Sequence, residues 1–175
     1  AVICREGFLE QEEIAEICLK LNLVIANKNS PNQVVVSGLV KDLENARPFF
    51  EKIGYIVYPL KVGGAFHSPL MNGAARDLKE VVKTIVFKHP KIPIFSNLTG
   101  SLVTDYNILV KKAPDQMVST VLWQNICVEI IESGIIGSED VIEAAERKIL
   151  TPFFGQTIEW YKKMYPEKFA DLARG

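Results

Sequence analysis

The chain has only two histidines, so few residues could serve as an acid–base group. His89 lies in Lys88-His89-Pro90-Lys91, where two cations disfavour imidazole protonation, and we interpret it as a solvated loop residue. His67 follows Gly63-Gly64-Ala65-Phe66 and precedes Ser68-Pro69, a sequence that allows close backbone approach and starts a helix. Such a turn can aim an imidazole into a cleft for general acid–base chemistry. The alternative is a histidine that packs in the core or caps a helix.

The cysteines point away from metal or disulfide chemistry. There are three of them, Cys4, Cys18 and Cys127, with neither CxxC nor Cys/His ligand spacing, so we expect buried free thiols, no metal and no cofactor. No secretory signal opens the sequence, which favours a reducing, cytoplasmic setting.

Composition excludes several classes of protein. Of 175 residues, 48% are apolar, and 20 Lys+Arg balance 21 Asp+Glu, so the chain is neither a disordered tail nor a basic nucleic-acid binder. Its longest apolar stretches fall far short of the roughly 20 residues of a membrane-spanning helix. A chain of this length can bury a core without disulfides. We therefore expect a folded protein with no nucleic-acid or membrane partner.

The first 62 residues alternate between strand-like and helical patterns. An amphipathic helix with an acidic front is predicted over residues 9–21, and a second over residues 39–53 is ended by Gly54, with Pro48 expected to kink or split it. The turn formers at 27–32 are expected to separate two strands. The predicted strands are 1–4, 23–26, 33–37 and 55–62. The resulting order, β-α-β-β-α-β, predicts a ferredoxin-like subdomain.

A different pattern begins at Gly63. A stripe from Leu70 to Ile85 predicts a helix of four or more turns that Pro90 stops, and Ile92–Phe95 is predicted to be a buried strand. Further expected elements are a short extended piece at 101–104, a helix near 121–132, a strand at 140–144 and an amphipathic tail from 158. We divide the chain into residues 1–62 (small subdomain), 63–157 (large subdomain) and 158–175 (tail or linker helix).

Three sequence blocks carry a family resemblance. The runs Val24–Gly38, Gly64–Met71 and Ile94–Gly100 resemble successive blocks of malonyl-CoA:acyl carrier protein transacylases and polyketide synthase acyltransferase domains, and weaker similarity extends over residues 1–154. The resemblance implies an α/β fold in which an α/β-hydrolase-like large subdomain carries a ferredoxin-like insertion.

The resemblance also implies roles for four residues. In this family a serine attacks malonyl-CoA and passes the malonyl group to the phosphopantetheine thiol of an acyl carrier protein, and His67 matches the histidine that acts as general base. Gln116, seven residues before Trp123, matches the glutamine whose backbone carbonyl holds that histidine. Phe66 matches a position that selects malonyl over branched groups, and Asn29 matches an asparagine near the acyl channel. Packing and turn roles remain the alternatives for Phe66 and Asn29.

The sequence departs from the family at two places. It contains no Gly-x-Ser-x-Gly, so we expect the serine, the arginine that pairs with the malonyl carboxylate and the glutamine of the oxyanion loop to lie upstream of Ala1. Ala145-Glu146-Arg147 replaces the usual Gly-Pro-Gly. We therefore expect the C-terminal portion of an acyltransferase, inactive alone and completed by an N-terminal segment. The alternatives are an editing hydrolase of acyl carrier protein thioesters with the same fold, and a noncatalytic carrier-protein-binding module.

Overall fold

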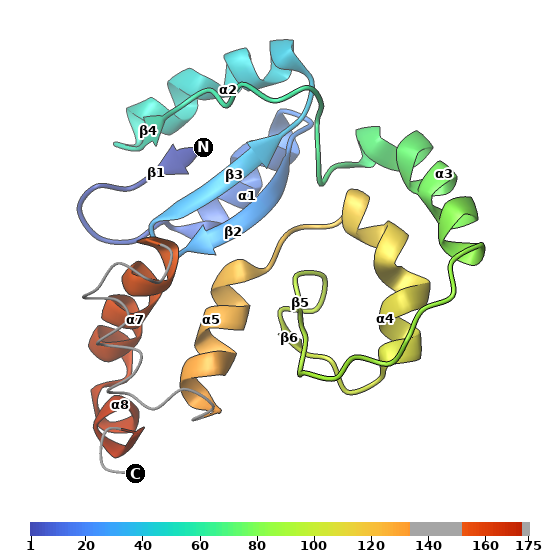
Figure 1. Ribbon diagram of the computed structural model, residues 1–175. Coiled ribbons are helices and arrows are strands. Elements are labelled where there is room, and N and C mark those ends of the chain that lie inside the picture. The colour runs from blue at the N-terminus through green and yellow to red at the C-terminus, as the bar shows by residue number, and fades with distance from the viewer. Residues whose placement is uncertain (134–151, 173–175) are drawn as a thin grey trace.

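A four-stranded antiparallel sheet forms the first part of the molecule (Figure 1). The computed structural model describes residues 1–133 and 152–172. The sheet order is β2-β3-β1-β4, and α1 (Gln11–Lys20) and α2 (Val40–Lys52) connect its strands in the order β-α-β-β-α-β. The strands are β1 (Val2–Ile3), β2 (Val24–Ser30), β3 (Gln33–Ser37) and β4 (Ile56–Val57). This arrangement confirms the predicted ferredoxin-like fold.

One face of this sheet is buried against both helices. Val2 pairs with Val34 on one side and Val57 on the other, which places these three side chains on the same face. They pack with Ile14 of α1 and Phe50 of α2. The full core comprises Val2, Leu9, Ile14, Cys18, Leu23, Val34, Ala46, Phe50 and Tyr55. The apolar stripes that predicted the two helices therefore supply the residues that cover the sheet.

The end of α2 is fixed by the predicted glycine. Gly54 has φ 89°, its N–H donates to Glu51 O at 3.0 Å, and the Tyr55 N–H donates to Phe50 O at 3.0 Å. These two bonds form a Schellman motif, which requires the left-handed conformation that glycine adopts without strain. Of the two predicted effects of Pro48, a kink or a split, the split does not occur, since α2 is continuous from Val40 to Lys52.

The predicted turn at 27–32 is mostly strand. β2 continues to Ser30, and only Pro31-Asn32 reverse the chain. Contacts from distant segments override the turn preference: the Lys28 N–H donates to Val121 O at 2.9 Å, and the buried Ser30 hydroxyl lies 2.8 Å from Gln156 Oε1. β4 is also shorter than the predicted 55–62, since its partner β1 has two residues.

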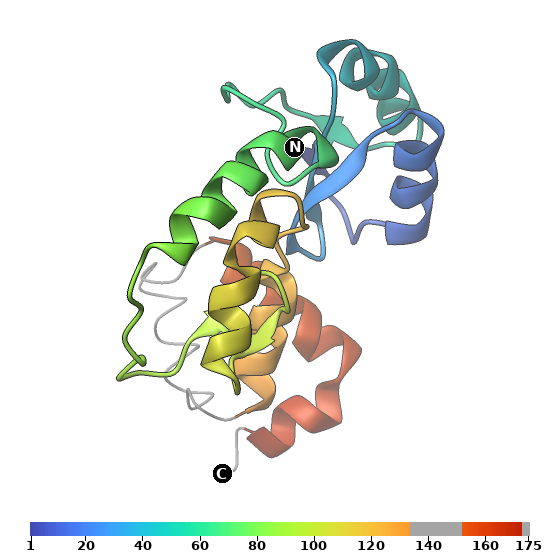
Figure 2. The same cartoon turned by 90° about the vertical axis from the view of Figure 1, so that its right-hand side faces the viewer.

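The second part of the molecule is mainly helical (Figures 1 and 2). A 3-10 turn, η1 (Pro69–Met71), leads into α3 (Asn72–Lys83), which ends before the predicted Ile85 and well before Pro90. None of the residues of α3 is buried. The other elements are β5 (Phe95–Ser96), β6 (Ser101–Leu102), α4 (Tyr106–Lys112), η2 (Ala113–Met117), α5 (Trp123–Glu132), α7 (Pro152–Met164) and α8 (Pro166–Leu172).

Two predictions about this part differ from the structure and one is confirmed. The helix near 121–132 is α5. The buried strand predicted at Ile92–Phe95 is wrong: the strand is Phe95–Ser96, and Ile92 is 74% exposed. α3 is shorter than predicted: it ends at Lys83, and Thr84 is its C-terminal cap. The strand predicted at 140–144 and the departure at 145–147 lie outside the described residues.

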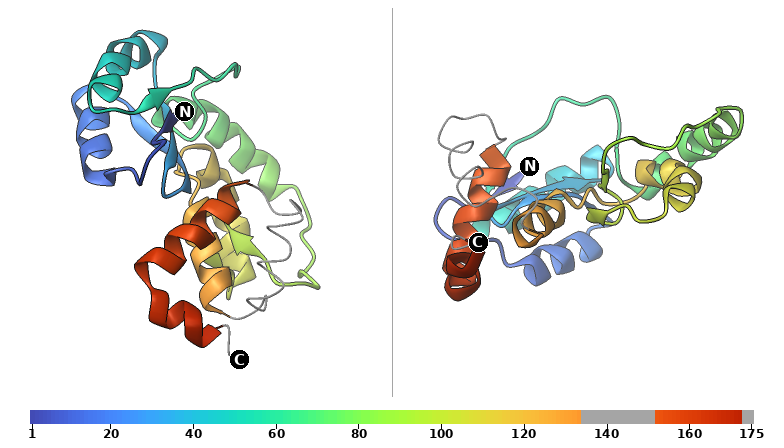
Figure 3. Two further views of the ribbon diagram at one scale, coloured as in Figure 1. Left: turned by 90° about the vertical axis from the view of Figure 1, so that its left-hand side faces the viewer. Right: turned by 60° about the horizontal axis from the view of Figure 1, so that its bottom comes forward.

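A second core joins α5 to α7 (Figure 3). It consists of Cys127, Ile131, Ile158 and Tyr161, with the Tyr161 hydroxyl donating to Glu132 Oε1 at 3.0 Å. The division placed between residues 157 and 158 falls within α7, whose residues on both sides of that point are buried. Across the described residues, no helix combines the length and apolarity needed to cross a membrane.

Candidate active site around His67

A tight turn holds His67 in an unusual backbone conformation. Its φ is 58°, a left-handed value that costs a residue with a Cβ about 1–3 kcal/mol. The next residue, Ser68, is buried; its hydroxyl donates to Ala65 O at 2.6 Å and accepts from the Leu70 N–H at 3.3 Å. Pro69 then begins η1. The Ser-Pro pair therefore caps the helical turn that directly follows His67.

The imidazole of His67 is held by a backbone carbonyl. Its Nδ1 lies 2.8 Å from Gln116 O, and its backbone N–H donates to Met117 O at 3.1 Å. A carbonyl oxygen only accepts hydrogen bonds, so Nδ1 carries the proton in this contact. In the neutral ring the lone pair is then on Nε2, which is the nitrogen available to accept a proton from a substrate or nucleophile.

A short segment ties this contact to the four-stranded sheet. The connecting segment, residues 118–122, runs from η2 to α5. Val121 forms an isolated parallel bridge with Asn27, in which its N–H donates to Ala26 O at 2.8 Å and its O accepts from Lys28. At the far end the Leu122 N–H donates to Asn97 O at 2.9 Å. The connecting segment therefore joins β2 and Asn97 to Gln116 and Met117, whose carbonyls contact His67.

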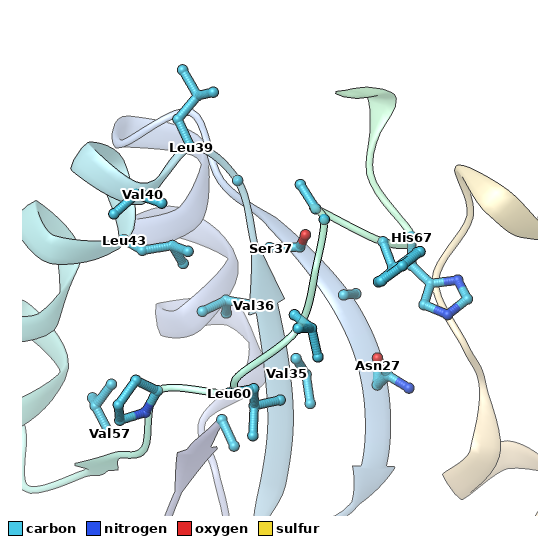
Figure 4. Close-up of a pocket in the computed structure, with 18 of the residues that line it drawn as sticks. Asn27, Val35, Val36, Ser37, Leu39, Val40, Leu43, Val57, Leu60 and His67 are labelled. Atoms are coloured by element: carbon cyan, nitrogen blue, oxygen red, sulfur yellow. The ribbon is translucent and has the colours of Figure 1, made fainter. Parts of the chain in front are cut away.

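A cavity of about 830 Å³ lies between the sheet and the linker that leads to His67 (Figure 4). Asn27 and His67 lie at one end of it in this view, while Leu43, Val57 and Leu60 lie toward the other. The imidazole points away from this aliphatic end, toward the neighbouring ribbon. The cavity volume is within the range of small-molecule sites.

The predicted site residues are brought together only in part. Phe66 lines the cavity beside His67 and is 45% exposed, and Gln116 reaches the site through its carbonyl. Asn29 does not line this cavity; its amide donates to Gln33 Oε1 at 2.9 Å on the neighbouring strand. Asn27 lines the cavity instead, and the sequence analysis missed it because it was assigned to a turn.

The charged groups in the cavity wall are Glu44 and Arg47 of α2. Arg47 Nε lies 2.7 Å from Glu51 Oε1, and both side chains are about half exposed, so this pair contributes little to stability. The arginine is thus already engaged with a carboxylate. Among the described residues no group of three or more His, Cys, Asp or Glu could hold a metal ion.

The cysteines are free thiols. Burial raises the pKa of Cys18 to about 11 and that of Cys127 to about 12, whereas Cys4 is only partly buried. The thiolate is the reactive form, and at pH 8 it is about a thousandfold less abundant than the thiol when the pKa is 11. Neither buried cysteine is therefore suited to be a nucleophile.

Alkylation tests this difference. We expect iodoacetamide at pH 8 to label Cys4 in the folded chain and to leave Cys18 and Cys127 unlabelled, with peptide mass mapping as the measurement. In denaturant all three should react, which serves as the control. Labelling of Cys127 in the folded chain at the rate of Cys4 would contradict the assignment.

Comparison with known proteins finds malonyl transacylases among the relatives of this chain. No protein-family model matches the chain. It is 33% identical over 138 residues to the polyketide biosynthesis malonyl CoA-acyl carrier protein transacylase PksC of Bacillus subtilis, a match that covers 76% of this chain and 48% of the relative. The malonyl CoA-acyl carrier protein transacylase of the same organism is 33% identical over 135 residues, covering 73% and 43%.

Solved structures give the same result. The malonyl CoA-acyl carrier protein transacylase of Clostridium perfringens matches with a TM-score of 0.70 and 28% identity, over 77% of this chain and 42% of that one. A malonyl-transacylase solved in complex with a type II polyketide synthase acyl-carrier protein also matches with a TM-score of 0.70 and 28% identity, over 78% and 44%.

The mixed α/β fold, with its small four-stranded sheet, is that of the acyltransferase class. More particularly, the chain is a homologue of the malonyl-CoA:acyl carrier protein transacylases and polyketide acyltransferases. It spans less than half the length of these relatives.

Proposed function

We propose that this chain is part of an acyltransferase that moves a malonyl or related acyl group from coenzyme A to an acyl carrier protein in the cytoplasm, without a cofactor. His67 is the general base, and a serine on a segment N-terminal to this sequence is the nucleophile. The observation that carries the proposal is the 2.8 Å contact between His67 Nδ1 and Gln116 O, because it leaves Nε2 to accept the serine proton.

The proposed reaction has two halves. In the first, Nε2 of His67 takes the serine proton as the oxygen attacks the thioester carbon, and the resulting imidazolium protonates the departing coenzyme A sulfur. In the second, Nε2 takes the proton of the phosphopantetheine thiol as its sulfur attacks the acyl-serine ester, and returns a proton to the serine oxygen. The Gln116 carbonyl acts like the aspartate of a serine protease triad, since it fixes the ring orientation and favours the Nδ1–H tautomer.

An apolar surface that is exposed among the described residues supports the proposal of a further segment. Leu70 of η1, Val81 of α3 and Ile85, two residues beyond the end of α3, are each about half exposed and follow a helical spacing. A helix with such a stripe normally packs it against a neighbour. We propose that the nucleophile-bearing segment covers this stripe and completes the site.

The test is to express the chain with its upstream sequence and incubate it with malonyl-CoA. We expect one malonyl group attached to a serine, visible as a mass increase of the intact protein and located by peptide mapping. Transfer of that group to a carrier protein should follow. Absence of the adduct in a folded protein would overturn the proposal.

A second candidate function is hydrolysis of acyl groups from carrier proteins. The feature that favours it is the aliphatic wall of the cavity, which includes Val36, Leu43 and Val57 and suits an uncharged acyl chain. The two functions can be distinguished by incubating the protein with acetyl- and malonyl-loaded carrier proteins and measuring hydrolysis. A hydrolase releases acetate, whereas a transferase retains the malonyl group on serine or carrier. Carrier binding that is unaffected by His67→Ala would instead indicate a noncatalytic module.

A further inference from the structure

We propose that Thr120 is a positioning residue that holds the Gln116 carbonyl against His67. Its hydroxyl donates to Ile25 O of β2 at 2.7 Å. Thr120 lies four residues after Gln116 and directly before Val121, so of the two residues of the connecting segment that bond to the sheet it is the nearer in sequence to Gln116. The inference rests on the proposed role of His67 but concerns the orientation of its ring.

The backbone bonds of Val121 do not fix this orientation alone. Both belong to one residue in an isolated bridge, and such a bridge has no neighbouring ladder bonds to define the direction of the chain. The bond from Thr120 adds a second attachment one residue closer to η2. Two attachments in succession set the direction in which the segment runs back to Gln116, whereas one allows it to pivot.

Beyond the end of η2, where the Val118 N–H donates to Asp115 O at 3.1 Å, the segment between Gln116 and Thr120 has little internal support. Its side-chain bond, from Gln116 Nε2 to Ser119 O, is 3.4 Å long, near the limit for a hydrogen bond. The two contacts that the segment makes to His67 are at 2.8 and 3.1 Å, and both weaken if the carbonyls move by a few tenths of an ångström. Loss of the Thr120 bond should therefore displace Gln116 O and Met117 O and so weaken their contacts with His67.

The measurable consequence is the tautomer of His67. A free neutral imidazole has both tautomers available, and the Gln116 carbonyl selects the Nδ1–H form. A hydrogen bond of this kind changes an equilibrium by about two- to tenfold. We expect Thr120→Val, which keeps the shape and removes the donor, to lower the ratio of Nδ1–H to Nε2–H tautomer by about that factor.

The experiment uses the full chain labelled with ¹⁵N-histidine. Long-range ¹H–¹⁵N spectra report the tautomer of each ring, and with two histidines the assignment needs only one His89→Gln variant. Thr120→Ser retains the hydroxyl and should restore the wild-type ratio. Thr84→Val is the matched control, because Thr84 also donates its hydroxyl to a backbone carbonyl, Val81 O at 2.8 Å, but at the end of α3.

Each outcome decides the proposal. The proposal is supported if Thr120→Val lowers the ratio of Nδ1–H to Nε2–H tautomer of His67, Thr120→Ser keeps the wild-type ratio, and Thr84→Val leaves it unchanged. It is overturned by unchanged His67 nitrogen shifts in folded Thr120→Val, by an equal change in Thr84→Val, or by a Thr120→Val chain that does not fold. Because the readout needs neither nucleophile nor substrate, the result does not depend on whether acyl transfer is the function.

Discussion

Replacement of His67 by alanine is expected to slow acylation of the completed enzyme by about 10²- to 10⁴-fold, the range over which a positioned general base accelerates proton transfer. The reason is geometric. The Gln116 carbonyl holds Nδ1 at 2.8 Å and so presents Nε2 as the acceptor, and alanine removes both the base and the ring that the carbonyl orients. The measurement is the rate of serine acylation by malonyl-CoA in single-turnover experiments.

His89→Ala is the matched control for that prediction. His89 is exposed and its ring contacts Tyr106 at a centroid distance of 5.4 Å, so its loss should leave the acylation rate within about twofold. A circular dichroism spectrum like that of the parent would show that His67→Ala remains folded. If His67→Ala acylates as fast as His89→Ala, His67 is not the base.

Replacement of Phe50 by alanine is expected to lower the free energy of unfolding by about 3–5 kcal/mol, the usual cost of deleting a buried aromatic ring. Phe50 is 1% exposed and packs in the core with Val2, Val34 and Ile14. The cavity already borders this ring, so the deletion enlarges an existing opening that the core cannot close. Urea denaturation followed by far-UV circular dichroism gives the change.

The neighbouring Phe49 provides the comparison within the same helix. It is 53% exposed, and Phe49→Ala should change the free energy of unfolding by less than about 1 kcal/mol. Both substitutions have the same effect on helix propensity, so their difference isolates burial. Equal losses for the two variants would mean that α2 does not pack on the sheet as described.

How far the sequence predicts this molecule depends on whether the deciding contacts are local. Helices α1 and α2 follow from apolar periodicity, and the end of α2 follows from Gly54, since a left-handed residue after a helix is a local requirement. The extension of β2 to Ser30 could not be predicted in this way. It depends on Val121 and Gln156, which lie about 90 and 126 residues further along the chain.

The candidate site shows the same division. The turn around His67 and the family resemblance both indicate that residue, and the resemblance indicates Gln116 through its spacing to Trp123. Neither the family resemblance nor the local sequence pattern indicates a role for Asn27 or Thr120. Both residues are linked to the site by the connecting segment, through the bridge at Asn27 and the hydroxyl of Thr120. A hydroxyl or an amide in a polar stretch of sequence does not by itself indicate a tertiary contact. Such residues become visible only when the segments that flank them are placed in space.

The bridge between Asn27 and Val121 also bears on association between copies of the chain. β2 is the outer strand of the four-stranded sheet, and an outer strand presents unpaired amides and carbonyls to which another molecule can add a strand. The backbone of Val121 forms hydrogen bonds with the Ala26 carbonyl and the Lys28 N–H, in the middle of that edge. The connecting segment thus covers part of the β2 edge, which disfavours edge-to-edge aggregation, and it also leads to the Gln116 carbonyl that contacts His67.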